Sequence, residues 1–147
     1  MSNASDYLEN KLVDQLFRGQ AAPSIGTLHV GLFTAAPSDS GGGVEVAGNA
    51  YARATVASSL ANWAGTQGAG TTAVSSGTTG ATSNNGVITF QPPAPAGWGL
   101  VTHFALFDSA LGGTNNMIVW GTLSASKTIN AGDTVTFPAA ALTVTIA

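Results

Sequence analysis

Short segments in which apolar residues alternate with polar or small ones recur along this chain, and clusters of glycine, proline and asparagine separate them. Such alternation is typical of strands that are buried on one face. In Thr27–Thr34, for example, Leu28, Val30 and Leu32 fall on one face of a pleat. The other predicted strands are Tyr51–Ser58, Gly86–Gln91, Leu100–Asp108, Met117–Leu123, Lys127–Asn130, Thr134–Phe137 and Ala141–Ile146. Since turn signals come roughly every 8–12 residues and no helix-length segment stands between strands, the pattern predicts a mainly β fold, an antiparallel β-sandwich or jelly roll.

Two of the connections between these strands carry predictions of their own. Gly65–Asn85 consists almost entirely of glycine, serine, threonine and alanine, which is typical of a flexible linker. Thr71, Thr72 and Val74 favour a second interpretation, a surface loop that carries an edge strand, and this is the one we expect. Ala131–Asp133 is predicted as the turn of a hairpin between the two strands that flank it.

The one helix is predicted near the N-terminus, over Asp6–Arg18. Ser5 or Asp6 can cap its start, and Gly19 is placed just past its end. The apolar stripe of this helix consists of Leu8, Leu12 and Leu16, widened by Val13 and Phe17. The domain organisation that follows is a helical element at residues 1–20 and a single β-sandwich domain at residues 21–147.

The apolar stripe of the helix has two interpretations. In the first, the helix packs on its own sheet, as most amphipathic helices do. In the second, Leu8, Leu12, Leu16 and Phe17 dock on a neighbouring subunit. The stripe is wide enough for both to hold.

Charged side chains are scarce, at 7% of the 147 residues, against roughly 25% in ordinary globular proteins. Five of the eleven lie between Asp6 and Arg18. A body so poor in charge suggests a surface covered by other subunits, although a neutral polar surface would also explain it. Four basic residues give no cluster for binding nucleic acid or a membrane surface, and no apolar run approaches the ~20 residues of a membrane-spanning helix. Without cysteine, disulfides and thiolate metal sites are excluded.

Candidate chemistry is sparse. His29 and His103 could supply half of a metal site, but Asp108 is the only carboxylate close to either in sequence and is poorly spaced for the role. Asp39 with Glu45 could serve a hard cation such as calcium, although their loop does not resemble an EF-hand. No nucleophile motif or phosphate-binding loop is found. We therefore predict no catalytic, cofactor-binding or metal-binding residues, and an enzyme is disfavoured.

The two histidines belong to an internal echo, because Leu28–Thr34 and Thr102–Asp108 share the frame His-x-small-Leu-Phe. Two strands lying side by side, with His29 near His103, would explain the match. Coincidence between two apolar strands is the interpretation that we expect, because a match of seven residues is weak evidence.

The tryptophans offer a different candidate site. Trp63 and Trp98, with Trp120 and Tyr51, could form a stacking platform for a sugar. Aromatic residues that are separated along strands more often belong to the core, which is the competing interpretation.

Several segments together resemble a family of short structural proteins of tailed bacteriophages and prophages, often labelled tail-fibre proteins. The residues that carry the resemblance are Asp6–Gly19 (DYLENKLVDQLFRG), Leu28–Arg53 with its VGLFTAAPSDSGGG and YAR, Asn62–Gly65 (NWAG), Thr82–Phe90 (TSNNGVITF) and Trp98–Asp108 (WGLVTHFALFD). The resemblance implies a place in the virion, after assembly in the cytoplasm of the bacterial host, with other capsid or tail subunits as partners. It carries over no catalytic residues and no cofactor. The chain has no long coiled coil or extended repeat, which a complete fibre shaft would need.

Two functions are compatible with these observations. The first is a non-catalytic structural subunit of the virion surface, either a capsid-decorating (cement) protein or a short fibre or tail component, which acts through subunit contacts and homo-oligomerises. The second is a carbohydrate-binding receptor module of the tail, with a host surface glycan as its ligand. The sequence does not distinguish a capsid from a tail location.

Overall fold

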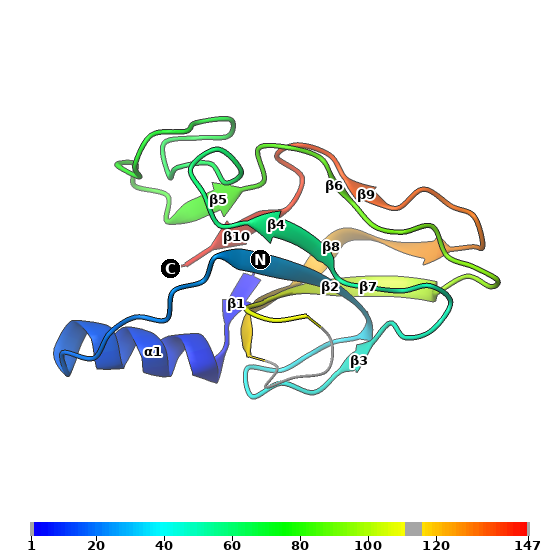
Figure 1. Ribbon diagram of the computed structural model, residues 1–147, viewed down its shortest axis with the longest axis horizontal. Helices are drawn as coiled ribbons and strands as arrows, with labels where there is room; N and C mark the ends of the chain where they lie inside the picture. Colours follow the sequence, from blue (N-terminus) through cyan, green and yellow to red (C-terminus); the bar gives the residue numbers. More distant parts are fainter. Residues whose placement is uncertain (1, 111–115, 147) are drawn as a thin grey trace.

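The computed structural model describes residues 2–110 and 116–146, and within them ten strands and one helix (Figure 1). The elements are β1 (Ser2–Ala4), α1 (Asp6–Phe17), β2 (Thr27–Ala35), β3 (Val44–Glu45), β4 (Ala54–Ala57), β5 (Ala81–Ser83), β6 (Ile88–Thr89), β7 (Gly99–Phe107), β8 (Met117–Ile129), β9 (Thr136–Phe137) and β10 (Thr143–Thr145). All strand pairs between them are antiparallel. The predicted mainly β class with one N-terminal helix is therefore confirmed.

A six-stranded sheet forms the main layer, in the order β1-β8-β7-β2-β3, with β4 also paired to β2. Its centre is the β2–β7 pair, which contains the two most strongly predicted strands. Gly31 lies opposite Ala105 there, with His29 opposite Phe107 and Phe33 opposite His103. The two copies of the echoed motif are thus side by side, as one interpretation predicted. Each histidine faces the other strand's phenylalanine, so the expected closeness of the two histidines is wrong.

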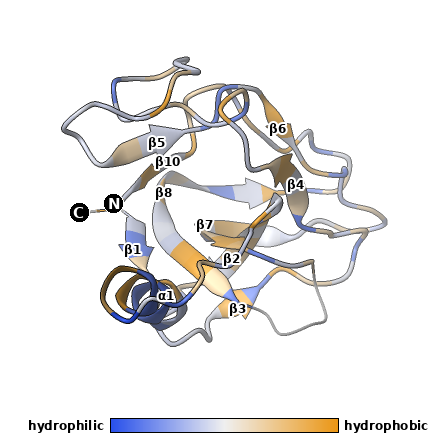
Figure 2. Ribbon diagram, turned by 60° about the vertical axis from the view of Figure 1, so that its left-hand side comes forward, coloured by the Kyte–Doolittle hydropathy of each residue, from blue (hydrophilic) through white to orange (hydrophobic). Residues whose placement is uncertain are grey.

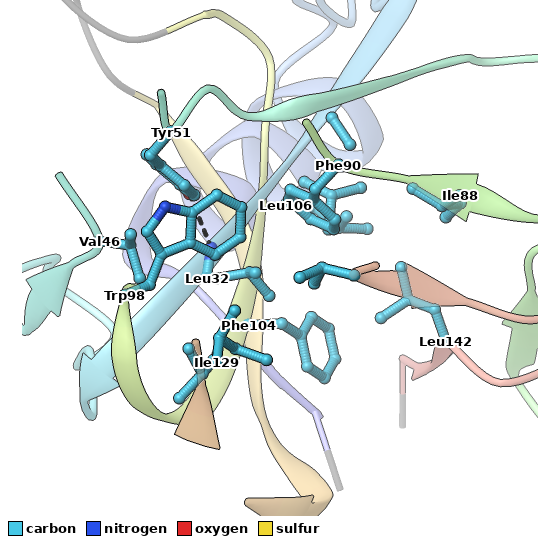
Figure 3. Packing of buried hydrophobic residues seen from close by; sticks show 14 of the residues in the cluster. Leu32, Val46, Tyr51, Ile88, Phe90, Trp98, Phe104, Leu106, Ile129 and Leu142 are labelled. Atoms are coloured by element: carbon cyan, nitrogen blue, oxygen red, sulfur yellow. Dashed lines mark hydrogen bonds between the residues drawn. The ribbon is translucent and has the colours of Figure 1, made fainter. Parts of the chain in front are cut away.

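The main core lies on one face of this sheet. Val30, Leu32 and Leu106 point into it and are at most 4% exposed. A second layer made of two short sheets, β5–β10 and β6–β9, covers them and contributes Ile88 and Leu142 (Figure 3). Further core side chains labelled in Figure 3 are Val46, Tyr51, Phe90, Trp98, Phe104 and Ile129. The arrangement is sandwich-like, and the jelly-roll topology stays a prediction.

The opposite face of the main sheet also buries apolar side chains. Phe33, Ala105, Phe107 and Met117 form a separate cluster there, against which Trp120 packs. The rings of Phe33 and Phe107 are stacked with centroids 6.2 Å apart. Because both faces of the β2–β7 pair are covered, its sequence is apolar at almost every position rather than at alternate ones.

The predicted hairpin around Ala131–Asp133 is wrong. β8 runs on to Ile129 and stays paired with β7, whereas β9 pairs with β6 in the other layer. Asp133 closes the connection, because its carboxylate accepts from the Asn130 N–H at 2.8 Å. The chain crosses between layers at this turn. The segment therefore has a hairpin's turn chemistry without a hairpin's pairing.

Residues 65–80 form a loop held by its own side chains. The hydrogen bonds are Gly65 N–H to Thr71 Oγ1 (2.9 Å), Thr71 Oγ1 to Gly68 O (2.7 Å), Gln67 Nε2 to Val74 O (2.7 Å), Gly77 N–H to Thr66 Oγ1 (2.9 Å) and Thr79 Oγ1 to Thr66 O (2.9 Å). The expected edge strand within Gly65–Asn85 is found as β5, which pairs with β10, although it lies at Ala81–Ser83 rather than at Thr71, Thr72 and Val74. In residues 65–80, hydroxyl and amide groups satisfy the backbone in place of a neighbouring strand.

Asn84 joins the parts of the second layer. Its side chain is buried, and its Oδ1 accepts from the Leu142 N–H at 2.9 Å. Its Nδ2 donates to the carbonyls of Gly86 (2.7 Å) and Pro138 (2.8 Å), and its own carbonyl accepts from the Ala140 N–H at 2.7 Å. The Asn84 side chain thus joins the loop between β5 and β6 to the loop between β9 and β10, as backbone hydrogen bonds would join two paired strands.

Candidate subunit interface

Helix α1 is fixed to the main sheet at its N-terminal end. Ser5 is the N-cap, as one of the two predicted candidates, and its Oγ accepts from the Leu8 N–H at 3.2 Å. The same hydroxyl donates to the carbonyl of Met117, and the Ser5 N–H donates to Ile118 O at 3.0 Å. The Asp6 N–H donates to Asp39 O at 3.0 Å. These bonds tie the first turn of the helix to the start of β8.

The C-terminal half of α1 carries apolar side chains that the body does not cover. Val13, Leu16 and Phe17 are 48%, 69% and 81% exposed. In Figure 2, where the helix is seen nearly end-on, its hydrophobic and hydrophilic residues lie on different sides. An exposed phenylalanine next to an exposed leucine is unusual for a helix whose partner is its own sheet, so this half is a candidate contact surface.

The predicted interface residues divide into two groups. Leu8 is half-buried and packs against the main core, and Leu12 is half-buried. Leu16 and Phe17 are exposed. Packing on the body therefore involves the first turns of the stripe, whereas docking on a neighbour stays a prediction for the last turn.

Arg53, which directly precedes β4, is a buried charged residue beside the main sheet. Its side chain is 1% exposed and forms a two-pronged ion pair with Glu45, with Nε–Oε1 and Nη2–Oε2 distances of 2.8 and 2.7 Å. The guanidinium also donates to Ser109 O at 3.0 Å and lies 3.3 Å from the centroid of the Phe107 ring. The pair covers Gly31, where an added Cβ would lie 2.8 Å from Glu45 Oε1. Glu45 is thus committed to a structural ion pair rather than to the calcium site considered above.

Tyr51 completes this buried network. Its hydroxyl donates to Glu45 Oε1 and accepts from the Leu32 N–H, both at 2.9 Å. Burial raises the pKa of Tyr51 far above its usual value, and the negative charge of Glu45 raises that pKa further. The folded protein therefore holds this proton at a pH at which the unfolded chain releases it.

Tyr51 should make the protein sensitive to alkaline pH. Its contribution to the free energy of unfolding is complete below the unfolded pKa of about 10, and it declines as the pH rises above that value. Tyr51→Phe should lower the free energy of unfolding by about 1–3 kcal/mol at neutral pH, because the Leu32 N–H and Glu45 lose a partner. Between about pH 9 and 11, the free energy of unfolding of the variant should also decrease less steeply with pH than that of the wild type. Urea unfolding across this range measures both effects, and parallel pH curves for the two proteins would contradict the assignment.

The two candidate sugar-stacking tryptophans occupy different environments. Trp98 is 7% exposed, its Nε1 donates to Asn49 O at 3.1 Å, and its ring meets the edge of Tyr51 in the core. This position favours the core interpretation for Trp98. Trp63 is half-buried and lines a groove of about 520 Å³ together with Leu60. Its Nε1 is buried and has no hydrogen-bond partner among the described residues.

The remaining candidates for chemistry do not converge. Nδ1 of His103 shares a 2.7 Å hydrogen bond with Thr102 Oγ1, and Asp39 accepts from the Trp120 indole at 2.9 Å. Within residues 2–110 and 116–146, no three histidine or carboxylate side chains are close enough to hold a metal ion. No helix in that part of the chain has the length and apolar character to cross a membrane. The candidate contact surfaces of the described residues are the exposed end of α1 and two apolar grooves.

Comparison with known proteins agrees with this picture. No curated protein sequence gives a significant match. A family model described as "Podophage GP4 fiber I protein gp80" matches residues 3–145, which include α1 and both layers of the fold. The predicted resemblance to tail-fibre proteins of bacteriophages is thereby confirmed, and a structural protein of the phage particle is indicated. The chain belongs to the podophage GP4 fiber I protein gp80 family.

Proposed function

We propose that this protein is a non-catalytic surface subunit of a short phage tail fibre that works by holding on to neighbouring subunits, with the outer half of α1 as its main contact. The observation that carries the proposal is the exposure of Leu16 and Phe17 at the end of a helix whose first turn is fixed to the sheet. Burying such side chains against another subunit would stabilise the contact between the subunits by about 1.5–3 kcal/mol for each large residue. Assembly would take place in the cytoplasm of the bacterial host.

The arrangement of polar groups supports a structural role. Three buried polar atoms, His29 Nδ1, Trp63 Nε1 and Asp108 Oδ1, have no partner among the described residues. Other buried polar groups are bound to one another or to backbone groups: Glu45 to Arg53, Asp108 Oδ2 to Tyr7 and Asn116, and Asn84 to three backbone groups. Groups used in this way hold the fold together.

Incorporation into virions tests the proposal. Particles assembled with Leu16→Ser/Phe17→Ser should contain much less of the protein than wild-type particles, while the isolated variant keeps its thermal unfolding midpoint. Val87→Ser is the matched control, because Val87 is 64% exposed and distant in sequence from the helix. Quantitative mass spectrometry of particles distinguishes the locations: few copies indicate the tail, and copies on the scale of the major capsid subunit indicate capsid decoration instead. A protein absent from particles would refute the proposal.

Glycan binding is the second candidate function. The supporting observation is the groove at Trp63, which places an indole ring beside Ser58 and Ser59. Aromatic faces bordered by hydroxyls are suited to a sugar ring. A glycan array discriminates this candidate: it requires signals that Trp63→Ala abolishes in a still folded protein, and an array without signal removes it.

A further inference from the structure

A second apolar groove, of about 430 Å³, lies where the two layers of the fold come apart. One wall is the second half of β8, which has β1 as a neighbour only at Val119–Gly121, and the other is β9 with the segment after it. The lining includes the core residues Leu32, Val101 and Phe104, with Phe137 and Pro138 at the opposite wall. The groove therefore reaches the main core from the outside.

The groove is lined by one charged residue, Lys127. Lys127 is exposed and makes no hydrogen bond or ion pair with any residue that the structure describes. The other charged side chains of the described body are all bonded: Glu45 with Arg53, Asp39 with Trp120, Asp108 with Tyr7, and Asp133 with the Asn130 N–H. An apolar groove with a free cation at its border would match an apolar surface that carries a carboxylate.

The exposed side of α1 is such a surface. Glu9, Val13 and Phe17 follow one another at intervals of four residues and so lie along one stripe, with Leu16 beside it. Glu9 is exposed, and its carboxylate has no partner among the described residues. Asp14, farther along the helix, is half-buried and already paired with Arg18 at 2.8 Å.

We propose that α1 of a second copy of this chain docks in the groove, with Val13, Leu16 and Phe17 against its apolar wall and Glu9 paired with Lys127. This inference rests on the proposed function and names the partner of the helix. Figure 1 shows α1 at one end of the long axis of the molecule, while the second half of β8 and β9 lie toward the other end. A helix therefore cannot reach its own groove while its first turn stays fixed to β8.

The contact is head-to-tail, because it joins two different surfaces of the chain. Each copy then offers one helix and one groove, so the contact repeats from copy to copy and produces a closed ring or an open filament. The open filament places identical subunits in a row, which is the form that a fibre requires.

Charge exchange between the two surfaces tests the proposal. Glu9→Lys and Lys127→Glu should each weaken self-association at least about tenfold, because each places like charges at the contact. The double variant Glu9→Lys/Lys127→Glu should recover most of the loss. Lys11→Glu is the matched control, since it makes the same change in net charge as Lys127→Glu on a side chain that lies over the Tyr7 ring. Analytical ultracentrifugation of the full chain measures the association, and circular dichroism confirms that each variant is folded.

A steric variant tests the groove without changing charge. Ala141→Trp fills the groove at an exposed lining residue and should also prevent association. A wild-type protein that stays monomeric at its highest soluble concentration, or single charge variants that associate normally, would overturn the proposal. The proposal would also be overturned if the charge variants weakened binding to another virion protein and left self-association unchanged. Normal incorporation of these variants into particles would overturn the head-to-tail contact and leave the proposed function standing, whereas a wild-type protein absent from particles refutes the function itself.

Discussion

Replacing Arg53 with alanine is expected to lower the free energy of unfolding by about 3–5 kcal/mol. The substitution leaves Glu45 largely buried without its cation, since the side chain of Glu45 is 16% exposed. It also removes the guanidinium from the face of Phe107 and the hydrogen bond to Ser109 O. Chemical denaturation at neutral pH measures the loss.

Arg18→Ala is the matched control for this prediction. Arg18 also forms an ion pair, with Asp14 at 2.8 Å, but its side chain is 70% exposed. An exposed pair of this kind contributes little, so the control should change the free energy of unfolding by less than about 0.5 kcal/mol. Replacing both partners of the buried pair, as in Glu45→Leu/Arg53→Met, should recover much of the loss, because no charge is then left unpaired. Equal losses for Arg18→Ala and Arg53→Ala would contradict the role given to burial.

Asn84→Ala is expected to lower the free energy of unfolding by about 3 kcal/mol. The substitution leaves the buried Leu142 N–H without an acceptor and the Gly86 carbonyl without the donor that it has in Asn84. It also removes one of the two donors to the Pro138 carbonyl, which still accepts from the Ala141 N–H. Alanine has no side-chain group that donates or accepts a hydrogen bond, so it replaces none of these contacts. Thermal unfolding should show a large fall in the midpoint temperature.

Two further variants sharpen the test of Asn84. Asn84→Asp keeps the shape of the side chain but aims a carboxylate at two carbonyl oxygens, so it should be no better than alanine. Asn62→Ala is the control, because the Asn62 side chain makes one exposed hydrogen bond, to Ala57 O. An aspartate variant as stable as the wild type would show that the donated hydrogen bonds contribute nothing.

The sequence predicts the elements whose formation depends on local pattern. β2 and β7 are found within one residue of their predicted bounds, because each has a long apolar run with turn residues at both ends. Helix α1 ends one residue before its predicted end, at Phe17, and Gly19 follows with a φ of 66°. Caps and turn residues are local chemistry, which a single sequence carries in full.

Contacts between distant segments could not be predicted in the same way. Glu45 and Arg53 meet only because β3 and β4 pair with different parts of β2, one on each side of Gly31 along the strand. The signal that could have revealed the pair is Gly31 itself, a glycine inside a strong strand, which indicates a close approach of other atoms. The groove at Lys127 likewise depends on which layer β9 joins, and the turn at Ala131–Asp133 is compatible with both.

The loop at residues 65–80 has a practical consequence for the survival of the protein outside the cell and for its detection. Between Trp63 and Phe90 the chain has no basic, aromatic or leucine residue, so trypsin and chymotrypsin find no cleavage site in a stretch that has the composition of an ordinary linker. The hydroxyl groups of Thr71 and Thr79 in this stretch also hold the loop backbone in place through hydrogen bonds. After complete tryptic digestion, residues 54–127 would remain a single peptide, so copies in particles are better counted from the short tryptic peptide at residues 12–18.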